Sequence, residues 1–247
     1  MREKILCSRL RIIYFSAAAS GFQFLWYYSP MPIAPDRILY EDAYLLAVNK
    51  LSGELVVKGA GAVQKLPLFD FLQKDYPGLR VLHRLDFETS GVVLFAKTKE
   101  AEAKVLNTKF EQWKKTYQCL VMGRINRPSG AIRKKLPARG RGVVDAETLY
   151  TVLDVFANST YVETIITTGR FHQIRKHFAG INHPLVLDKE YGHSKFNQLF
   201  KQELGYNTFF LHATTLEFPH PMTGEDMTIE APLPKAFSAL IKKLRSL

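Results

Sequence analysis

The side chains of this chain that could do chemistry gather in residues His83–Gly91, HRLDFETSG. This segment holds two carboxylates, one guanidinium and two hydroxyls, and it runs into the apolar, strand-like residues 92–96. If residues 81–86 are extended, the two-residue period of a strand sends Arg84 and Asp86 to the same side. With both groups on one face, the carboxylate could react with a sugar while the cation binds a neighbouring phosphate. A short-range ion pair at the start of a strand would use the same residues, and the residue types alone favour it.

Further motifs accompany this segment in a fixed order. They are ILYEDAYLLAVNKLSG at 38–53, KKTYQCLVMG at 114–123, TGRFHQIRKHFAG and NHPLVLDKEYG within 168–192, and LHATTLEFPHPMTGEDMTIEAPLP at 211–234. Together with HRLDFETSG, which is similar to an HRLDxxTSG signature, these motifs resemble the RluA family of RNA pseudouridine synthases over residues 37–235. The resemblance implies that the chain isomerises a uridine in structured ribosomal or transfer RNA.

The resemblance also implies roles for individual residues. It carries the catalytic aspartate of the family onto Asp86. The reaction breaks the bond between ribose C1′ and base N1, and the freed uracil rejoins through C5. The carboxylate could attack C1′ or remove the 2′ proton, and the sequence does not choose between these routes. By the same resemblance, Arg175 pairs with the carboxylate, Tyr117 lies against the target base, and Arg84 enters the RNA helix where the uridine leaves it.

Residues 124–142 form a basic stretch with seven cationic side chains and no acidic one. Its prolines and glycines argue against a regular helix. A flexible cationic loop can follow a phosphate backbone and release counterions, which makes RNA contact our preferred interpretation. The alternative is a solvated loop with incidental charge.

The residues predicted to bind RNA come from this stretch and from the motifs. They are Arg84, His83, Lys50, Arg133, Lys134, Lys135, Arg170, His172 and Lys176. For His83 and His172, a packed polar side chain is an open alternative. His172 and His177 are five residues apart, which fits no zinc motif, so we predict neither a metal nor a cofactor.

The composition indicates a polyanionic partner. The 247 residues carry a formal net charge of +11, and residues 1–30 account for only a small part of it. A cationic globular chain favours nucleic acid or an acidic membrane surface. We predict RNA as the partner, no membrane association, and a monomer. Cys7 and Cys119 are too few for a disulfide framework and fit no zinc motif, so we predict reduced thiols in the cytoplasm.

The chain divides into an extension, residues 1–30, and a catalytic domain, residues 31–247. In the extension, basic residues precede an apolar run that superficially suggests a secretory signal. The run is interrupted by polar residues and falls short of the ~20 residues of a membrane span. We therefore expect a poorly ordered or alternative-start extension.

Strand-like segments outnumber helical ones in the domain. Short apolar strands separated by turns predict an α+β fold with a mixed, largely antiparallel sheet and peripheral helices. The resemblance adds a central basic cleft. Helices are predicted at 66–76, at 99–114 with a stripe of Ala103, Leu106, Phe110 and Trp113, and after Pro234.

Two other classes of protein could use parts of this pattern. A non-catalytic RNA-binding or ribosome-assembly factor would explain the basic stretch, but it gives no reason for Asp86 and Arg175 together. A glycoside hydrolase also acts at a sugar C1′, but it usually needs two carboxylates that flank the bond. Glu88 could nominally supply the second one.

Two positions depart from the pattern of the family. Leu51 stands where the usual N-K-P-S-G turn has its proline, and Leu187 replaces the usual glycine before Asp188. Both changes affect loop geometry rather than candidate chemical groups, and they leave open which RNA is the substrate.

Overall fold

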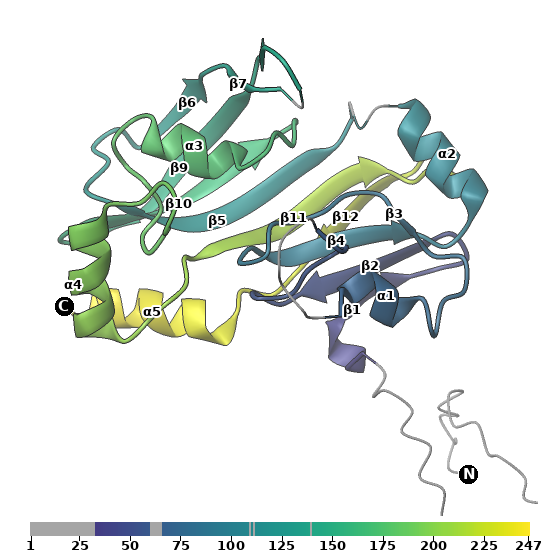
Figure 1. Cartoon of the computed structure of the whole chain (residues 1–247), viewed down its shortest axis with the longest axis horizontal. Coiled ribbons are helices and arrows are strands. Elements are labelled where there is room, and N and C mark those ends of the chain that lie inside the picture. Colours follow the sequence, from purple (N-terminus) through teal and green to yellow (C-terminus); the bar gives the residue numbers. More distant parts are fainter. Residues whose placement is uncertain (1–32, 60–65, 109, 111, 139) are drawn as a thin grey trace, which may run out of the picture. The chain divides into compact units, whose positions relative to one another are not determined.

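A mixed β-sheet carries the described part of the chain. The computed structural model describes residues 33–59, 66–108, 110, 112–138 and 140–247. The predicted extension, residues 1–30, and Arg139 of the basic stretch lie outside these residues. Residues Ile33–Leu247 make up one structural unit (Figure 1).

The main sheet has ten strands in the order β1-β2-β4-β11-β5-β10-β9-β6, with β3 added beside β4 and β12 beside β11. Only β4 and β11 pair in parallel among the described strands, and the other pairs are antiparallel. This confirms the predicted α+β class. The strands are β1 (Ile38–Glu41), β2 (Leu45–Lys50), β3 (Arg80–Val81), β4 (Ser90–Ala96), β5 (Lys114–Met122), β6 (Ser129–Arg133), β9 (Glu147–Val155), β10 (Ser159–Ile166), β11 (Leu211–Pro219) and β12 (Asp226–Glu230), and β7 (Leu136–Pro137) and β8 (Val143–Val144) form a separate pair.

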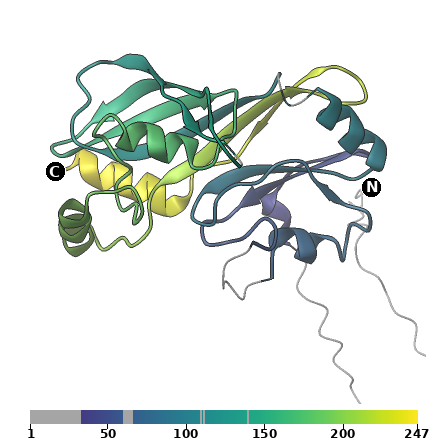
Figure 2. The same ribbon diagram turned by 45° about the horizontal axis from the view of Figure 1, so that its top comes forward.

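The helices lie at the periphery of this sheet. They are the 3-10 turn η1 (Pro35–Arg37) and the α-helices α1 (Leu68–Leu72), α2 (Lys99–Asn107), α3 (Gln173–Ala179), α4 (Ser194–Leu204) and α5 (Lys235–Arg245). Figure 1 shows α3 in front of β9, α4 and α5 near the C-terminus, and α1 and α2 at the other end of the sheet. The long neighbours β5 and β11 run between these two ends (Figures 1 and 2).

The apolar runs noted in the sequence become the centre of the sheet. Every residue of β4 is buried, because both faces of this strand are covered. Val93 and Phe95 belong to one hydrophobic cluster, and Val92 and Leu94 belong to a second cluster on the other face. Because side chains alternate along the strand, β4 contributes residues to both hydrophobic clusters.

The parallel contact between β4 and β11 anchors the end of the HRLDFETSG segment. Gly91 has φ +116°, and a Cβ there would lie 2.1 Å from the carbonyl oxygen of Ala213, so only glycine fits. Next to it, Ser90 Oγ and His212 Nδ1 form a hydrogen bond of 2.9 Å. The loop that carries Asp86 therefore enters β4 at a tightly held point.

Two local predictions are wrong. The helix predicted at 99–114 ends at Asn107, and it buries Ala101 and Val105, whereas Leu106 of the expected stripe is 51% exposed. Phe110 has φ 61°, which no α-helix accommodates, and its ring packs edge-on against Trp113 beyond the helix. Also, part of the basic stretch forms the strands β6 and β7 rather than a flexible loop.

Candidate active site

The loop between β3 and β4 that carries Asp86 is tied down by a buried ammonium. Lys50 Nζ donates hydrogen bonds to the carbonyl oxygens of Leu51 (3.0 Å), Phe87 (3.1 Å) and Thr89. The side chain of Lys50 is fully buried, and burial lowers its pKa to about 7. The prediction that Lys50 contacts RNA is therefore wrong, because its three protons are used to hold the loop around Asp86.

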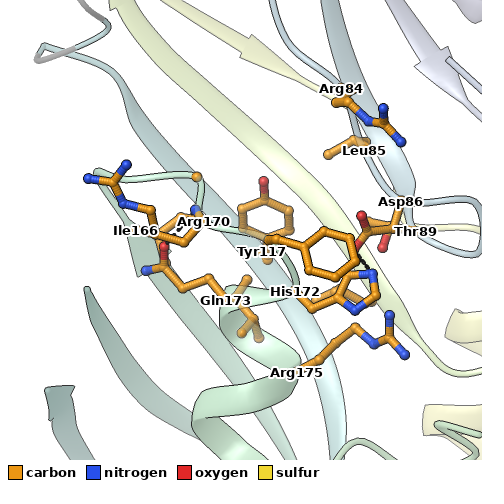
Figure 3. Close-up of a pocket in the computed structure, with 14 residues that line it drawn as sticks. Arg84, Leu85, Asp86, Thr89, Tyr117, Ile166, Arg170, His172, Gln173 and Arg175 are labelled. Atoms are coloured by element: carbon orange, nitrogen blue, oxygen red, sulfur yellow. Dashed lines mark hydrogen bonds and ion pairs between the residues drawn. The ribbon is translucent and has the colours of Figure 1, made fainter. Parts of the chain in front are cut away.

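Asp86 faces a cavity of about 450 Å³ (Figure 3). The cavity lining combines polar and apolar side chains from the Asp86 loop, β5, β10, β11 and the segment that enters α3. Its members are Arg84, Leu85, Asp86, Thr89, Tyr117, Ile166, Gly169, Arg170, Phe171, His172, Gln173, Ile174, Arg175 and Leu211. Glu88 is not among them, and its Oε1 pairs with Lys189 Nζ at 3.5 Å. A second carboxylate, as the glycoside hydrolase alternative requires, thus does not line the cavity at this position.

His172 is the ionisable group next to Asp86. Its Nε2 lies 3.7 Å from Asp86 Oδ2, and its Nδ1 lies 3.1 Å from the hydroxyl of Tyr191. The backbone of His172 is left-handed, with φ 54°, a strained conformation for this residue type that turns the chain into α3. Burial lowers the pKa of His172 despite the opposing charge of Asp86, so the imidazole is neutral at neutral pH.

Arg175 is held by a different carboxylate from the one expected. Its Nε and Nη2 donate to Asp188 Oδ2 at 2.6 Å and Oδ1 at 2.8 Å, and Nη2 lies 3.3 Å from Glu190 Oε2. The predicted direct pair with Asp86 is wrong. Asp188 can accept two parallel hydrogen bonds from the guanidinium fork, and its side chain has no exposed surface. Burial alone would raise the pKa of Asp188, but the hydrogen bonds from Arg175 and from backbone amides outweigh it and lower that pKa.

Tyr117 lies in β5 and lines the same cavity as Asp86. Its side chain is 7% exposed, and its hydroxyl has no hydrogen-bond partner in the described part of the chain. Burial, with the nearby charge of Asp86, raises the pKa of Tyr117, so the phenol stays protonated. The ring is therefore available as a neutral surface for a planar base.

Thr89 is a candidate that the sequence did not reveal. Its amide donates to the carbonyl of Asp86 at 3.1 Å, which is the turn role expected from the motif. Its hydroxyl, however, is buried and has no hydrogen-bond partner among the described residues, and Thr89 lines the cavity. A buried polar group without a partner is destabilising unless a ligand satisfies it. No sequence pattern announces such a hydroxyl, because its lack of a partner depends on the packing around it.

The comparisons with known proteins identify the family. A sequence model of the family described as RNA pseudouridylate synthase matches residues 44–180. The Ribosomal large subunit pseudouridine synthase C of Escherichia coli strain K12 is 36% identical over 229 residues, which are 85% of this chain and 70% of that protein. The chain belongs to the RNA pseudouridylate synthase family. It is an isomerase of the RluA type, as the motif order predicts.

Other pseudouridine synthases agree with this assignment. The protein of the same name from Yersinia pestis is 36% identical over 223 residues, covering 85% of this chain and 69% of that protein. Among solved structures, Human RNA Pseudouridylate Synthase Domain Containing 4 superposes with a TM-score of 0.71 at 25% identity, covering 84% of this chain and 92% of that one. The sheet and its peripheral helices are thus the catalytic fold of the family.

The basic residues of this pseudouridine synthase fall into distinct environments. Arg84 and Arg170 are exposed at the cavity, and Lys176 Nζ lies 4.8 Å from the ring centre of Phe171, which is 60% exposed. Residues of the β7–β8 pair and Arg170, Phe171 and Lys176 line a neighbouring cavity of about 440 Å³. One end of the basic stretch therefore lies beside the cavity that Asp86 faces.

The expectation that the basic stretch lacks compensating acids needs correction. Arg133 Nε lies 2.5 Å from Glu147 Oε1, and Lys135 Nζ lies 3.9 Å from Asp145 Oδ1. Both acids follow the stretch in sequence and return beside it through the strand pairing. Lys134 is exposed, and no ion pair joins its ammonium to a described residue.

His83 is a packed polar group rather than an RNA contact, which corrects its assignment to the RNA-binding residues. Its Nε2 accepts a hydrogen bond of 3.0 Å from the amide of Leu94, and its ring packs edge-on against Trp113. Burial lowers the pKa of His83 to about 3, so the ring carries no charge that could attract a phosphate.

The two departures from the family pattern have local consequences. Leu187 adopts φ 67°, the left-handed conformation that a glycine accommodates without strain, and its side chain is buried. The Leu51 amide donates to Glu54 Oε2 at 2.9 Å, a bond that a proline could not make. Both changes are therefore accommodated within their own loops.

Neither a metal-binding cluster nor a membrane-spanning helix is found among the described residues. In the ranges that the structure describes, no group of three His, Cys, Asp or Glu side chains is placed to hold a metal ion. Likewise, none of the described helices is long and apolar enough to cross a membrane.

Proposed function

We propose that this chain converts a uridine of large-subunit ribosomal RNA into pseudouridine, with Asp86 as the catalytic carboxylate. One observation carries the proposal: the Asp86 side chain, 30% exposed, opens into the cavity that Tyr117 also lines. A carboxylate and an aromatic face in one cavity match a ribose and its attached base. The names of the bacterial relatives support large-subunit ribosomal RNA as the substrate class.

The surroundings of Asp86 support both routes that the chemistry allows. Whether the carboxylate attacks C1′ or removes the 2′ proton, it must be ionised beside the sugar. Neutral His172 adds no positive charge that would weaken it, and Arg175 acts on Asp86 only at a distance, because Asp188 and Glu190 take its hydrogen bonds.

The detached uracil must stay in place while it turns. The ring of Tyr117, which lines the cavity, offers a stacking surface for it. Arg84 lies on the Asp86 side of the cavity and Arg170 on the other side of Tyr117 (Figure 3). A guanidinium at the rim can stack in the space that the flipped uridine leaves.

The test uses an unmodified transcript of large-subunit ribosomal RNA and the full chain. Wild type should convert one or a few uridines, detected by chemical mapping of pseudouridine and by mass spectrometry of nuclease fragments. Asp86→Asn should lose the product while it still binds the transcript. Glu88→Gln is the matched control, because Glu88 carries the same charge two residues away and points to Lys189.

The outcomes separate the alternatives. Product formed by Asp86→Asn would remove Asp86 from its proposed role. A transfer RNA transcript converted in preference to the ribosomal one would overturn the substrate class but leave Asp86 in place. Binding without any conversion by wild type would favour the RNA-binding alternative. The monomeric state and the cytoplasmic location stay predictions.

A further inference from the structure

A second cavity, of about 750 Å³, adjoins the Asp86 cavity and carries an unusual set of charges. It shares Arg84, Tyr117, Gly169 and Arg170 with the first cavity. Among the six residues that it adds is Lys115, which stands two positions before Tyr117 in β5. Because side chains alternate along a strand, Lys115 and Tyr117 point to the same side of the sheet. Lys115 thus lines the second cavity, and Tyr117 lines both cavities.

Lys115 is held without a counter-charge. Its Nζ forms no hydrogen bond or ion pair with any residue of the described ranges, and its nearest aromatic group is Trp113, 5.6 Å from Nζ to the ring centre. The same ammonium lies 3.4 Å from where a Cβ on Gly169 would be. Burial lowers the pKa of Lys115 to about 8, and no neighbouring carboxylate opposes this effect. The nearest titratable group, His83, is neutral.

The neighbouring Lys114, unlike Lys115, has an ion-pair partner. Lys114 is the preceding residue of the same strand and points to the opposite face, where its Nζ pairs with Glu217 Oε1 at 2.8 Å. Around the second cavity, Arg84, Lys115 and Arg170 are three cations, and none of them has an ion pair among the described residues. Like charges that share a cavity repel one another, so an anion between them would stabilise the arrangement.

We propose that Lys115, together with Arg84 and Arg170, binds a backbone phosphate of the RNA next to the target uridine. This inference rests on the proposed function, since it takes the nucleotide chain to pass the Asp86 cavity. A polynucleotide whose base occupies that cavity must carry its phosphates along the rim, and Arg84 and Arg170 line both cavities. The hydroxyl of Thr168, which also lines the second cavity, can contribute a hydrogen bond to phosphate.

The test is the salt dependence of binding, measured with the full chain and the unmodified ribosomal transcript. Lys115→Met should weaken binding about three- to tenfold near 0.1 M salt, and should reduce the slope of log Kd against log salt by about 0.7 to 1, the loss of one phosphate contact. Lys115→Arg should keep the slope. Lys114→Met removes the same charge from the opposite face and should leave affinity and slope unchanged.

A second measurement observes Lys115 in the wild-type protein, so it does not require the Lys115→Met variant to fold. Lysines carrying ¹³C-methyl groups give NMR signals that titrate, and the Lys115 signal is the one missing from Lys115→Arg. Its midpoint should rise when the transcript binds, because an anion stabilises the ammonium. A rise with sodium phosphate alone but not with the transcript, or an unchanged salt slope in Lys115→Met, would overturn the phosphate site.

These results are separable from the proposed function. Binding with the expected slopes but without conversion of uridine would refute the proposed reaction and keep the phosphate site. Conversion of uridine with an unchanged slope in Lys115→Met would refute the phosphate site and keep the reaction.

Discussion

His172 Nε2 lies 3.7 Å from Asp86 Oδ2, and no described cation lies closer to that carboxylate. The family resemblance led us to expect Arg175 in this position. Arg175 instead forms a bidentate pair with Asp188, so the direct neighbour of the proposed catalytic carboxylate is an imidazole. An imidazole, unlike a guanidinium, can lose its charge near neutral pH, and this makes the site sensitive to pH.

The activity should therefore fall on acidification in a way that depends on His172. Burial lowers the pKa of His172 below its usual 6.5, so the ring is neutral at pH 7. It becomes charged only when the pH falls through this lowered pKa. A cation beside Asp86 would weaken it as a base or nucleophile. Profiles of kcat/KM from pH 5 to 8 should show this acid limb in wild type and a reduced limb in His172→Gln. Identical limbs in both proteins would show that His172 does not control Asp86.

The pair of Arg175 and Asp188 should contribute strongly to stability. Arg175→Met leaves a carboxylate without exposed surface and without its partner, so we expect the free energy of unfolding to fall by about 3–5 kcal/mol. The double variant Arg175→Met, Asp188→Leu removes both charges and should recover much of that loss in urea titrations. If Arg175 serves the reaction through its charge, this double variant stays inactive although it is folded. Recovered activity would assign Arg175 a purely structural role.

Lys50 should act on catalysis through the Asp86 loop and not through RNA binding. Lys50→Met removes the donor for three carbonyl oxygens, and we expect a loss of about 2–3 kcal/mol in the free energy of unfolding. Because Lys50 has no exposed surface, the Kd for the transcript should stay near that of wild type while kcat falls. Arg84→Ala is the comparison, since it removes an exposed cation and should weaken binding. A Kd that rises equally in both variants would contradict the buried role.

Thr89 should trade stability for activity. Replacing its buried hydroxyl, which has no partner, by the methyl group of Thr89→Val should raise the free energy of unfolding by about 1 kcal/mol. If that hydroxyl binds the substrate, the same variant should lower kcat/KM about tenfold, equivalent to one hydrogen bond. Thr89→Ser keeps the hydroxyl and should retain most activity. A stabilised Thr89→Val with full activity would show that the hydroxyl contacts no substrate.

The sequence was sufficient for the elements whose burial follows from local pattern. The apolar run of β4 predicted a strand, and the helix predicted after Pro234 is α5. The helix predicted at 99–114 already ends at Asn107, and Phe110 of the expected stripe lies beyond it with a left-handed backbone. The spacing of apolar residues identifies the buried face of a helix, but it does not reveal where the helix ends.

The sequence by itself determined the family and the chemical groups, because HRLDFETSG and the motifs that follow it keep residue types, spacing and order. Only the tertiary structure decided which charges meet. Lys50 reaches the carbonyl of Phe87, Arg175 turns to Asp188, and Lys115 has no ion-pair partner among the residues that the structure describes. These pairings depend on distances of a few ångströms between segments far apart in the chain, and on the burial that makes such distances energetically important.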